Sequence, residues 1–183
     1  MRINDKIYFS PSLLLEKLDL TNKTLVLTSF KERIESYYFK PIKTLNDNHD
    51  AFASGAILCL LIDAFARYST TEDSVGVRIV NWCCKHLCID EKTAKSFYSF
   101  FRCGLLHESH IKNYGQFTFD KEFTHSIIEY SGFIVVNPSI LCSASLKYFD
   151  DFIAELNSND DLYSIFIGRL KTDFADEINE AKT

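Results

Sequence analysis

The stretch AFASGAILCLLIDAFARY, residues 51–68, contains the longest apolar run of the chain and decides its fold. Residues 51–62 carry no charge, and Asp63 and Arg67 follow soon after. A membrane span needs about 20 apolar residues, so this uncharged run is too short to cross a bilayer. The stretch instead predicts a helix buried at the centre of a soluble, mainly helical protein with no membrane partner.

The segments that flank this stretch also have the periodicity of helices. Apolar residues recur at helical spacing over residues 27–45, 75–87 and 94–105. Pro41 lies inside the first of these patterns and predicts a kink or a break there. Asp90 precedes the third pattern and is a favourable N-cap for that helix.

Both ends of the chain carry further helical patterns. Leu14, Leu15 and Leu18 predict a short helix after Ser10-Pro11. The pair Asn137-Pro138 predicts an N-cap and a first-turn proline, and a helix follows them. Residues 162–178 place an apolar residue every four positions, which predicts one last helix. We therefore expect at least five helices.

The periodicity changes between residues 114 and 137. Residues 116–120 alternate in polarity, and residues 127–136 are rich in β-branched side chains, with Gly132 among them. These two stretches predict the two strands of a small antiparallel β-hairpin, with a bulge or bend at Gly132. The expected architecture is one helical domain over residues 1–183, with a β insertion at about 114–137.

Charge and cysteine content narrow the class of protein. Residues 1–112 hold 15 Lys and Arg against 13 Asp and Glu, and residues 113–183 hold 5 against 12. Phosphate binding is therefore expected in the first two-thirds of the chain and not in the acidic last third. The N-terminus lacks the apolar stretch of a secretory signal, and six cysteines fit free thiols. A cytoplasmic location follows.

The cysteine-rich stretch Cys83, Cys84, His86 and Cys88 resembles a metal site. Structural zinc needs four converging ligands, whereas only Cys84 and Cys88 share one face of a helix. No second ligand pair with suitable spacing follows, so packing thiols are the favoured interpretation. No phosphate-binding glycine loop or nucleophile elbow is present, and no metal or other cofactor is predicted.

The segment Arg102-Cys103-Gly104-Leu105-Leu106-His107 has side chains suited to RNA cleavage. Attack by the 2′-hydroxyl of RNA requires a group that moves protons near neutral pH, as histidine does. It also requires a cation that stabilises charge on the phosphate, as arginine does. On an ideal helix, residues five apart lie about 140° apart. Arg102 and His107 therefore meet only where the helix loosens near Gly104 or where the arginine side chain wraps around it.

These residues resemble the signature of the HEPN superfamily (higher eukaryotes and prokaryotes nucleotide-binding domains), an arginine and, four to six residues later, a histidine. The resemblance covers residues 24–110 and 138–180. It implies a helical bundle, a homodimer, and a metal-independent endoribonuclease of a toxin or defence system, with Arg102 and His107 as its catalytic residues. The family usually has a polar residue, often asparagine, after the arginine, where this chain has Cys103.

Two neighbours of the motif have expected supporting roles. Asp63 is a carboxylate in an apolar helix and needs a partner, which is either Arg67 one turn along or Arg102 across the bundle. Glu108 follows His107 directly and is a candidate for orienting its ring, although a solvated surface glutamate is the ordinary alternative.

Three other interpretations of the segment remain open. In the first, Arg102 forms a structural salt bridge and His107 caps the helix C-terminus. In the second, the chain is a non-catalytic HEPN-like module that binds RNA, nucleotide or a partner protein such as a cognate antitoxin. In the third, it is a helical interaction protein whose acidic C-terminal helix is the binding face.

Overall fold

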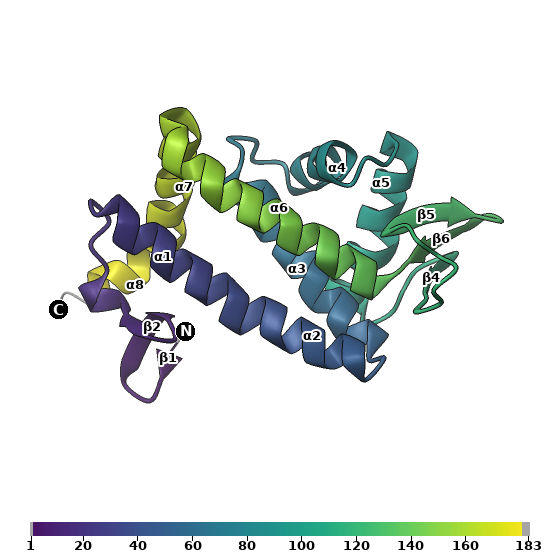
Figure 1. Cartoon of the computed structure of the whole chain (residues 1–183), viewed down its shortest axis with the longest axis horizontal. Coiled ribbons are helices and arrows are strands. Elements are labelled where there is room, and N and C mark those ends of the chain that lie inside the picture. Colours follow the sequence, from purple (N-terminus) through teal and green to yellow (C-terminus); the bar gives the residue numbers. More distant parts are fainter. Residues whose placement is uncertain (1, 181–183) are drawn as a thin grey trace.

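The computed structural model describes residues 2–180, which form a mainly helical protein with two small sheets (Figure 1). The elements follow the order β1 (Arg2–Ile3), β2 (Lys6–Ser10), β3 (Leu13–Leu14), η1 (Leu15–Lys17), α1 (Lys23–Ile34), η2 (Glu35–Phe39), α2 (Lys40–Asp47), α3 (Ala51–Tyr68), α4 (Val75–His86), α5 (Glu91–Phe97), η3 (Tyr98–Glu108), β4 (Gly115–Phe117), β5 (Ile127–Tyr130), β6 (Phe133–Val136), α6 (Pro138–Ser158), α7 (Asp160–Asp173) and α8 (Ala175–Glu180). Of these, η1 is a 3₁₀ turn, and η2 and η3 are π-helical.

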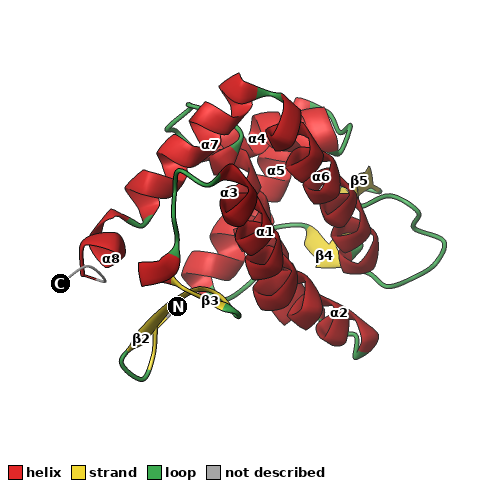
Figure 2. Cartoon of the chain, turned by 60° about the vertical axis from the view of Figure 1, so that its left-hand side comes forward, coloured by secondary structure: helices red, strands yellow, loops and turns green. Residues whose placement is uncertain are grey.

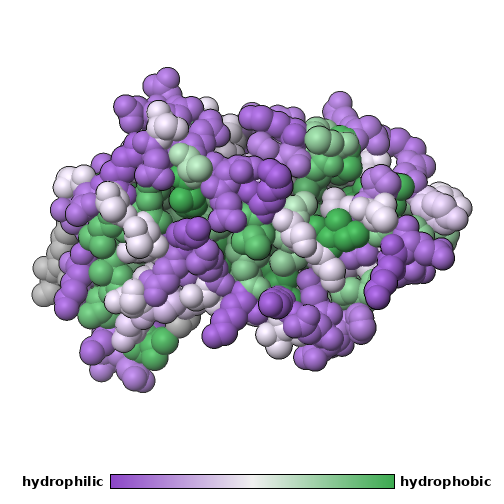
Figure 3. Space-filling view, in the orientation of Figure 1, coloured by the Kyte–Doolittle hydropathy of each residue, from purple (hydrophilic) through white to green (hydrophobic). Residues whose placement is uncertain are grey.

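Helix α3 lies at the centre of the bundle, as its apolar sequence predicts (Figure 2). It packs against α2, α4, α6, α7, η2 and η3. By length and composition α3 is long and apolar enough to cross a membrane. Its packing among these six elements is compatible with a soluble protein. Hydrophilic side chains cover most of the face seen in Figure 3, and apolar side chains reach the surface in separate patches.

Aromatic rings join the long helices in the core. Phe65 of α3 stacks on Phe149 of α6, with 5.5 Å between ring centroids. Phe30 of α1 contacts Phe166 of α7 edge to face, with a centroid distance of 4.9 Å. All four side chains are fully buried. The many phenylalanines of the sequence thus bring α1, α3, α6 and α7 around one centre.

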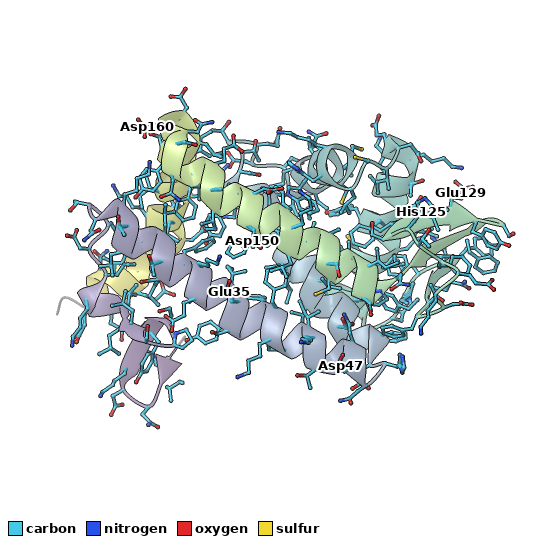
Figure 4. All side chains as sticks on the ribbon, in the orientation of Figure 1. Glu35, Asp47, His125, Glu129, Asp150 and Asp160 are labelled. Carbon is cyan, nitrogen blue, oxygen red and sulfur yellow. The ribbon has the colours of Figure 1, made fainter. Side chains whose placement is uncertain are left out.

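The helix around Pro41 continues where the sequence predicts a kink or a break. Segment η2 joins α1 to α2, and the Lys40 N–H donates to the Glu35 carbonyl, which closes a widened turn directly before Pro41. This turn accommodates a residue that lacks an N–H and crowds the preceding carbonyls. Alongside, Lys31 Nζ of α1 lies 3.3 Å from Asp150 Oδ1 of α6 (Figure 4).

The β insertion differs from the predicted hairpin. The antiparallel pair is β5 with β6, and Ser131 and Gly132 form the turn between them, both with positive φ. Strand β4 instead pairs parallel with β6, so the sheet has the order β4-β6-β5. The prediction treated residues 127–136 as one strand, but a two-residue turn that contains glycine divides them.

The N-terminal helix prediction was wrong. Leu14 belongs to β3, which pairs with β2, and Leu15 begins the single 3₁₀ turn η1. So short a helix gains little from its own hydrogen bonds, whereas pairing with β2 satisfies the backbone. The predicted last helix is also divided, because α7 ends at Asp173 and Phe174 packs against Phe9 with a centroid distance of 5.4 Å.

Both predicted N-caps are confirmed. The Asp90 carboxylate accepts a hydrogen bond from the Thr93 N–H, and Asn137 Oδ1 accepts from the N–H groups of Ser139 and Ile140. These caps fix where α5 and α6 begin. Helix α5 then leads without interruption into η3, which carries the Arg102–His107 segment.

Candidate functional site

Segment η3 brings Arg102 and His107 into contact. A π-helical turn closes hydrogen bonds between residues five apart, so it places such residues on one side of the helix. Arg102 Nη1 lies 2.8 Å from His107 Nε2. Tyr98 and Cys103, which are also five apart, hydrogen-bond in the same way. The loosened helix is therefore what allows the two side chains of the motif to meet.

Gly104 permits the chain to fold back over the end of η3. Its carbonyl accepts from the N–H groups of Ser109 and His110, and Ser109 has a φ of 59°. A Cβ at Gly104 would lie 2.4 Å from the His110 carbonyl oxygen, so a larger residue does not fit. The Lys112 N–H then donates to the Phe100 carbonyl at 3.0 Å, which holds the returning loop against η3.

Asp63 of α3 holds two arginines from neighbouring elements. Its Oδ2 accepts from Arg102 Nη2 at 2.8 Å, and its Oδ1 accepts from Arg78 Nη2 at 2.7 Å. The Asp63 and Arg102 side chains are 16% and 15% exposed, and that of Arg78 is 6% exposed. Arg78 Nη1 also donates to the Asp73 carbonyl at 3.1 Å. Asp63 thus connects α3, α4 and η3 through charge-assisted hydrogen bonds.

The surroundings of Arg102 favour its charged form. Burial lowers the pKa of Arg102, but the hydrogen bond and the charge of Asp63 outweigh it, so that the pKa is raised. The guanidinium also lies over the Tyr98 ring, with 5.9 Å to the centroid. The pKa of Tyr98 is raised, first by burial and then by its hydrogen bond with Cys103. Arg102 is consequently a fixed cation with one face toward an aromatic ring.

The contact between Arg102 and His107 uses an arginine donor. Arginine has only donors, so this hydrogen bond forms in the tautomer of His107 whose Nε2 accepts. His107 is exposed, whereas Arg102 is largely covered. The pair therefore presents to solvent an imidazole beside a cation that Asp63 holds from behind. Such a pair is suited to moving a proton next to an anionic group.

The other predicted residues lie as follows. Of the two expected partners of Asp63, Arg102 is the one found, while Arg67 forms a bidentate pair with Asp173 of α7. Glu108 does not contact His107 but pairs with Lys112, and the hydrogen bond with Lys112 lowers the pKa of Glu108. The expectation that Glu108 orients the His107 ring was wrong, because the returning loop places Lys112 within its reach.

Arg78 is a member of the site that the sequence interpretation missed. It stands in the apolar stripe of residues 75–87, between Val77 and Ile79, and its side chain is almost fully buried. A charged residue in an apolar helical stripe needs a buried counter-charge, and that requirement matches the one inferred for Asp63. The sequence therefore contained a signal for this contact: Arg78 and Asp63 have opposite charges, each lies in an apolar helical pattern, and each needs a buried partner.

The cysteine-rich stretch does not form a ligand set. Cys83 is buried, Cys84 is half-buried and Cys88 is exposed. Burial is the main cause that raises the pKa of Cys83 well above its ordinary value. Over residues 2–180, no three or more His, Cys, Asp or Glu side chains are grouped so that they could hold a metal ion.

Comparison of the chain with family models, curated proteins and solved structures gave no match.

Proposed function

We propose that the chain is a cytoplasmic endoribonuclease in which Arg102 and His107 act on the scissile phosphate of RNA without a metal ion. The observation that carries this proposal is the 2.8 Å contact between Arg102 Nη1 and His107 Nε2, with Arg102 held by Asp63 on its other side. These two residues, five apart, lie in a π-helical segment, and π-helical turns are rare and recur at functional sites. The resemblance to HEPN ribonucleases adds a place in a toxin or defence system, with an antitoxin or similar protein as partner.

The proposed reaction begins when an RNA phosphate displaces His107 from Arg102. A non-bridging phosphate oxygen accepts from Arg102 Nη1, and His107 Nε2 becomes free to accept a proton. Nε2 takes the proton of the 2′-hydroxyl, the 2′-oxygen bonds to phosphorus, and the bond to the 5′-oxygen breaks. The products are a 2′,3′-cyclic phosphate and a 5′-hydroxyl end.

The departing 5′-oxygen needs a proton from a second group. In-line displacement places the attacking and leaving oxygens on opposite sides of phosphorus, so one imidazole does not reach both. In the proposed homodimer, the protonated His107 of a second copy supplies this proton. Two exposed apolar side chains belong to the helices that carry Asp63 and Arg78, and such a dimer would cover them: Leu60, three residues before Asp63, and Val77, next to Arg78 in the sequence.

Cleavage by the purified protein tests the reaction. Wild-type protein should cleave single-stranded RNA in the presence of a chelator and leave 2′,3′-cyclic phosphate ends. His107→Ala should lower the rate roughly 10²–10⁴-fold, because it removes the proton-transfer group. Arg102→Lys should also lower it, because lysine keeps the charge but loses the planar fork that reaches both Asp63 and a phosphate.

His125→Ala is the matched control, because His125 is exposed beside the β4-β6-β5 sheet (Figure 4). It should cleave RNA at the wild-type rate. Circular dichroism should show that all variants fold, since His107 is exposed. Intact RNA with wild-type protein, together with unfolding of His107→Ala, would show that His107 is structural. RNA binding without cleavage would instead favour the non-catalytic module.

Sedimentation tests the proposed dimer. Leu60→Glu should produce monomers and reduce cleavage, because it places a charge in the surface beside Asp63. Phe133→Glu is the control, since Phe133 is similarly exposed but lies on β6, on the second sheet. If the wild-type protein sediments as a monomer at micromolar concentration while it cleaves RNA, the second proton donor is not another copy of His107.

A further inference from the structure

A cavity of about 490 Å³ lies between α4 and α6, and residues from the end of α3 and Leu162 of α7 also line it. Small-molecule sites commonly have volumes of roughly 300–1,000 Å³. The cavity shares one residue with the site described above, because Arg78 lines it. The Arg78 terminal nitrogens are bound to Asp63 and to the Asp73 carbonyl. Its Nε is covered from solvent and has no hydrogen-bond partner among the described residues.

Three residues that line the cavity each leave a buried polar atom without a hydrogen-bond partner in the described chain. These atoms are Arg78 Nε, Trp82 Nε1 and the Tyr148 hydroxyl. Burial raises the pKa of Tyr148 and the nearby donors of Trp82 and Ser69 oppose this, so the last two atoms lie close to each other without good hydrogen-bond geometry. Arg78 and Trp82 are 7% and 3% exposed, so water does not reach them freely. Leaving a buried polar atom unpaired costs roughly 1–3 kcal/mol. Two of the three are obligate donors, and a ligand with acceptor atoms would satisfy them.

Aromatic rings form much of the cavity wall. Tyr148 contacts Trp82 and His86 edge to face, with centroid distances of 4.8 Å and 4.5 Å. On its other side Tyr148 stacks on Phe152, at 5.7 Å. Aliphatic side chains complete the wall, namely Ala66, Ala144 and Leu162. The interior therefore accepts an apolar body, and the ring faces tolerate a neighbouring cation.

Charges of both signs stand at the rim of the cavity. Lys147 Nζ pairs with Asp151 Oδ2 at 2.8 Å, which neutralises both. Lys85 of α4, Glu72 in the loop before α4 and Glu155 of α6 also line the cavity, and none of them forms an ion pair with another residue of the described range 2–180. Glu155 Oε1 accepts from Asn159 Nδ2 at 3.2 Å, and Glu72 Oε1 accepts from the Ser74 N–H at 2.7 Å. Burial and Lys85 lower the pKa of His86, whereas the charge of Glu155 raises it. One cation and two carboxylates without an ion pair therefore line the opening.

We propose that this cavity binds a small zwitterionic molecule with an apolar body, of which a free hydrophobic amino acid is the simplest. The donors Arg78 Nε, Trp82 Nε1 and Lys85 all belong to α4 and would receive the carboxylate. Glu155 belongs to α6 and would receive the ammonium group beside the Tyr148 ring. This inference does not depend on the proposed ribonuclease activity.

The only tryptophan of the chain, Trp82, reports on the cavity directly. Titration with L-phenylalanine should change Trp82 fluorescence saturably, and calorimetry should give the same dissociation constant. N-acetyl-L-phenylalanine and L-phenylalaninamide each lack one charge, and each should bind roughly ten- to a hundredfold more weakly, because a hydrogen bond to a charged group contributes about 1.5–3 kcal/mol. Adenosine monophosphate, which is an anion, should bind more weakly than L-phenylalanine.

Two variants assign the charges to residues. Glu155→Gln should weaken the binding of L-phenylalanine about tenfold and leave the binding of N-acetyl-L-phenylalanine unchanged, because only the first ligand has an ammonium group. Lys171→Met, an exposed residue on α7 outside the cavity, should change neither. The proposal is overturned if L-phenylalanine gives no signal by either method, if the blocked derivatives bind equally well, or if adenosine monophosphate binds more tightly. Because no RNA cleavage is measured, none of these results bears on the ribonuclease proposal.

Discussion

Two π-helical segments, η2 (Glu35–Phe39) and η3 (Tyr98–Glu108), interrupt the helices of this protein for different reasons. Segment η2 is five residues long, ends at Phe39, two residues before Pro41, and leads back into an α-helix. Segment η3 has eleven residues, ends in the left-handed Ser109 and leads into a loop that returns along it. The first widened turn accommodates a residue without an N–H, and the second accommodates a chain reversal.

The comparison shows what a widened turn does for side chains. In η3 it brings Arg102 to His107 and Tyr98 to Cys103, and Asp63 fixes Arg102 from the neighbouring helix. Within residues 2–180, the one ion pair of η2 is a surface contact between Glu35 and Lys31 of α1, with 3.7 Å between Oε1 and Nζ. Widening a helix therefore does not by itself build a site. The fixed arginine in η3 is what distinguishes the two segments.

Removing the charge that fixes η3 should have the largest effect. Asp63→Asn leaves Arg78 and Arg102 mostly buried without a counter-charge, and breaking such a buried pair costs roughly 3 kcal/mol. We expect urea denaturation to show this loss and RNA cleavage to fall with it. Asp173→Asn is the matched control, because it removes a half-buried pair with Arg67 away from the site. It should cost less stability and leave cleavage unchanged.

A methyl group at Gly104 should test whether η3 must remain π-helical. The added Cβ meets the His110 carbonyl oxygen at 2.4 Å, and such overpacking costs roughly 1–3 kcal/mol. Relief by tightening toward an α-helix would separate Arg102 from His107, so RNA cleavage by Gly104→Ala should also fall. Gly168→Ala on α7 is the control, because no atom lies within 4 Å of its Cβ. Its stability should be unchanged or higher by up to about 1 kcal/mol. Equal melting of the two variants would show that η3 tolerates the change.

The sequence predicted the parts of this protein that rest on periodicity and capping. The apolar pattern of residues 51–68 fixed α3 as the central helix, and the side chains of Asp90 and Asn137 marked where α5 and α6 begin. For the candidate site, the sequence predicted Arg102 and His107 from the charge and proton-transfer properties of their side chains, and Asp63 from its need for a buried partner. The angle between residues five apart also showed that the first two could meet only if the helix loosened or if the arginine side chain wrapped around it.

The remainder depended on contacts between distant residues. Strand β4 pairs with β6 across the loop 118–126, and no local pattern reveals whether such a pair is parallel. The length of η3 follows from the return of Lys112 to Phe100, and the role of Arg78 follows from the approach of α4 to α3. Glu108 was misassigned for the same reason, because its partner Lys112 lies in that returning loop.

A smaller effect is expected where Cys103 departs from the polar residue usual in HEPN ribonucleases. Cys103→Asn should leave RNA cleavage unchanged or raise it up to about tenfold, since one hydrogen bond to a charged group is worth roughly 1.5 kcal/mol. Initial rates on one defined RNA would measure the change. A tenfold loss would instead show that the hydrogen bond between Cys103 and Tyr98 is needed to hold η3.

The smallest effect is expected in η2. A proline inside a regular helix costs about 3 kcal/mol, because it lacks one hydrogen bond and its ring crowds the carbonyl four residues before it. The hydrogen bond from the Lys40 N–H to the Glu35 carbonyl shows that the turn before Pro41 is already widened. If widening has removed that crowding, Pro41→Ala should change the free energy of unfolding by less than about 1 kcal/mol and leave RNA cleavage unaffected. A gain of the full 3 kcal/mol in urea denaturation would mean that the widened turn of η2 does not relieve the crowding that Pro41 causes.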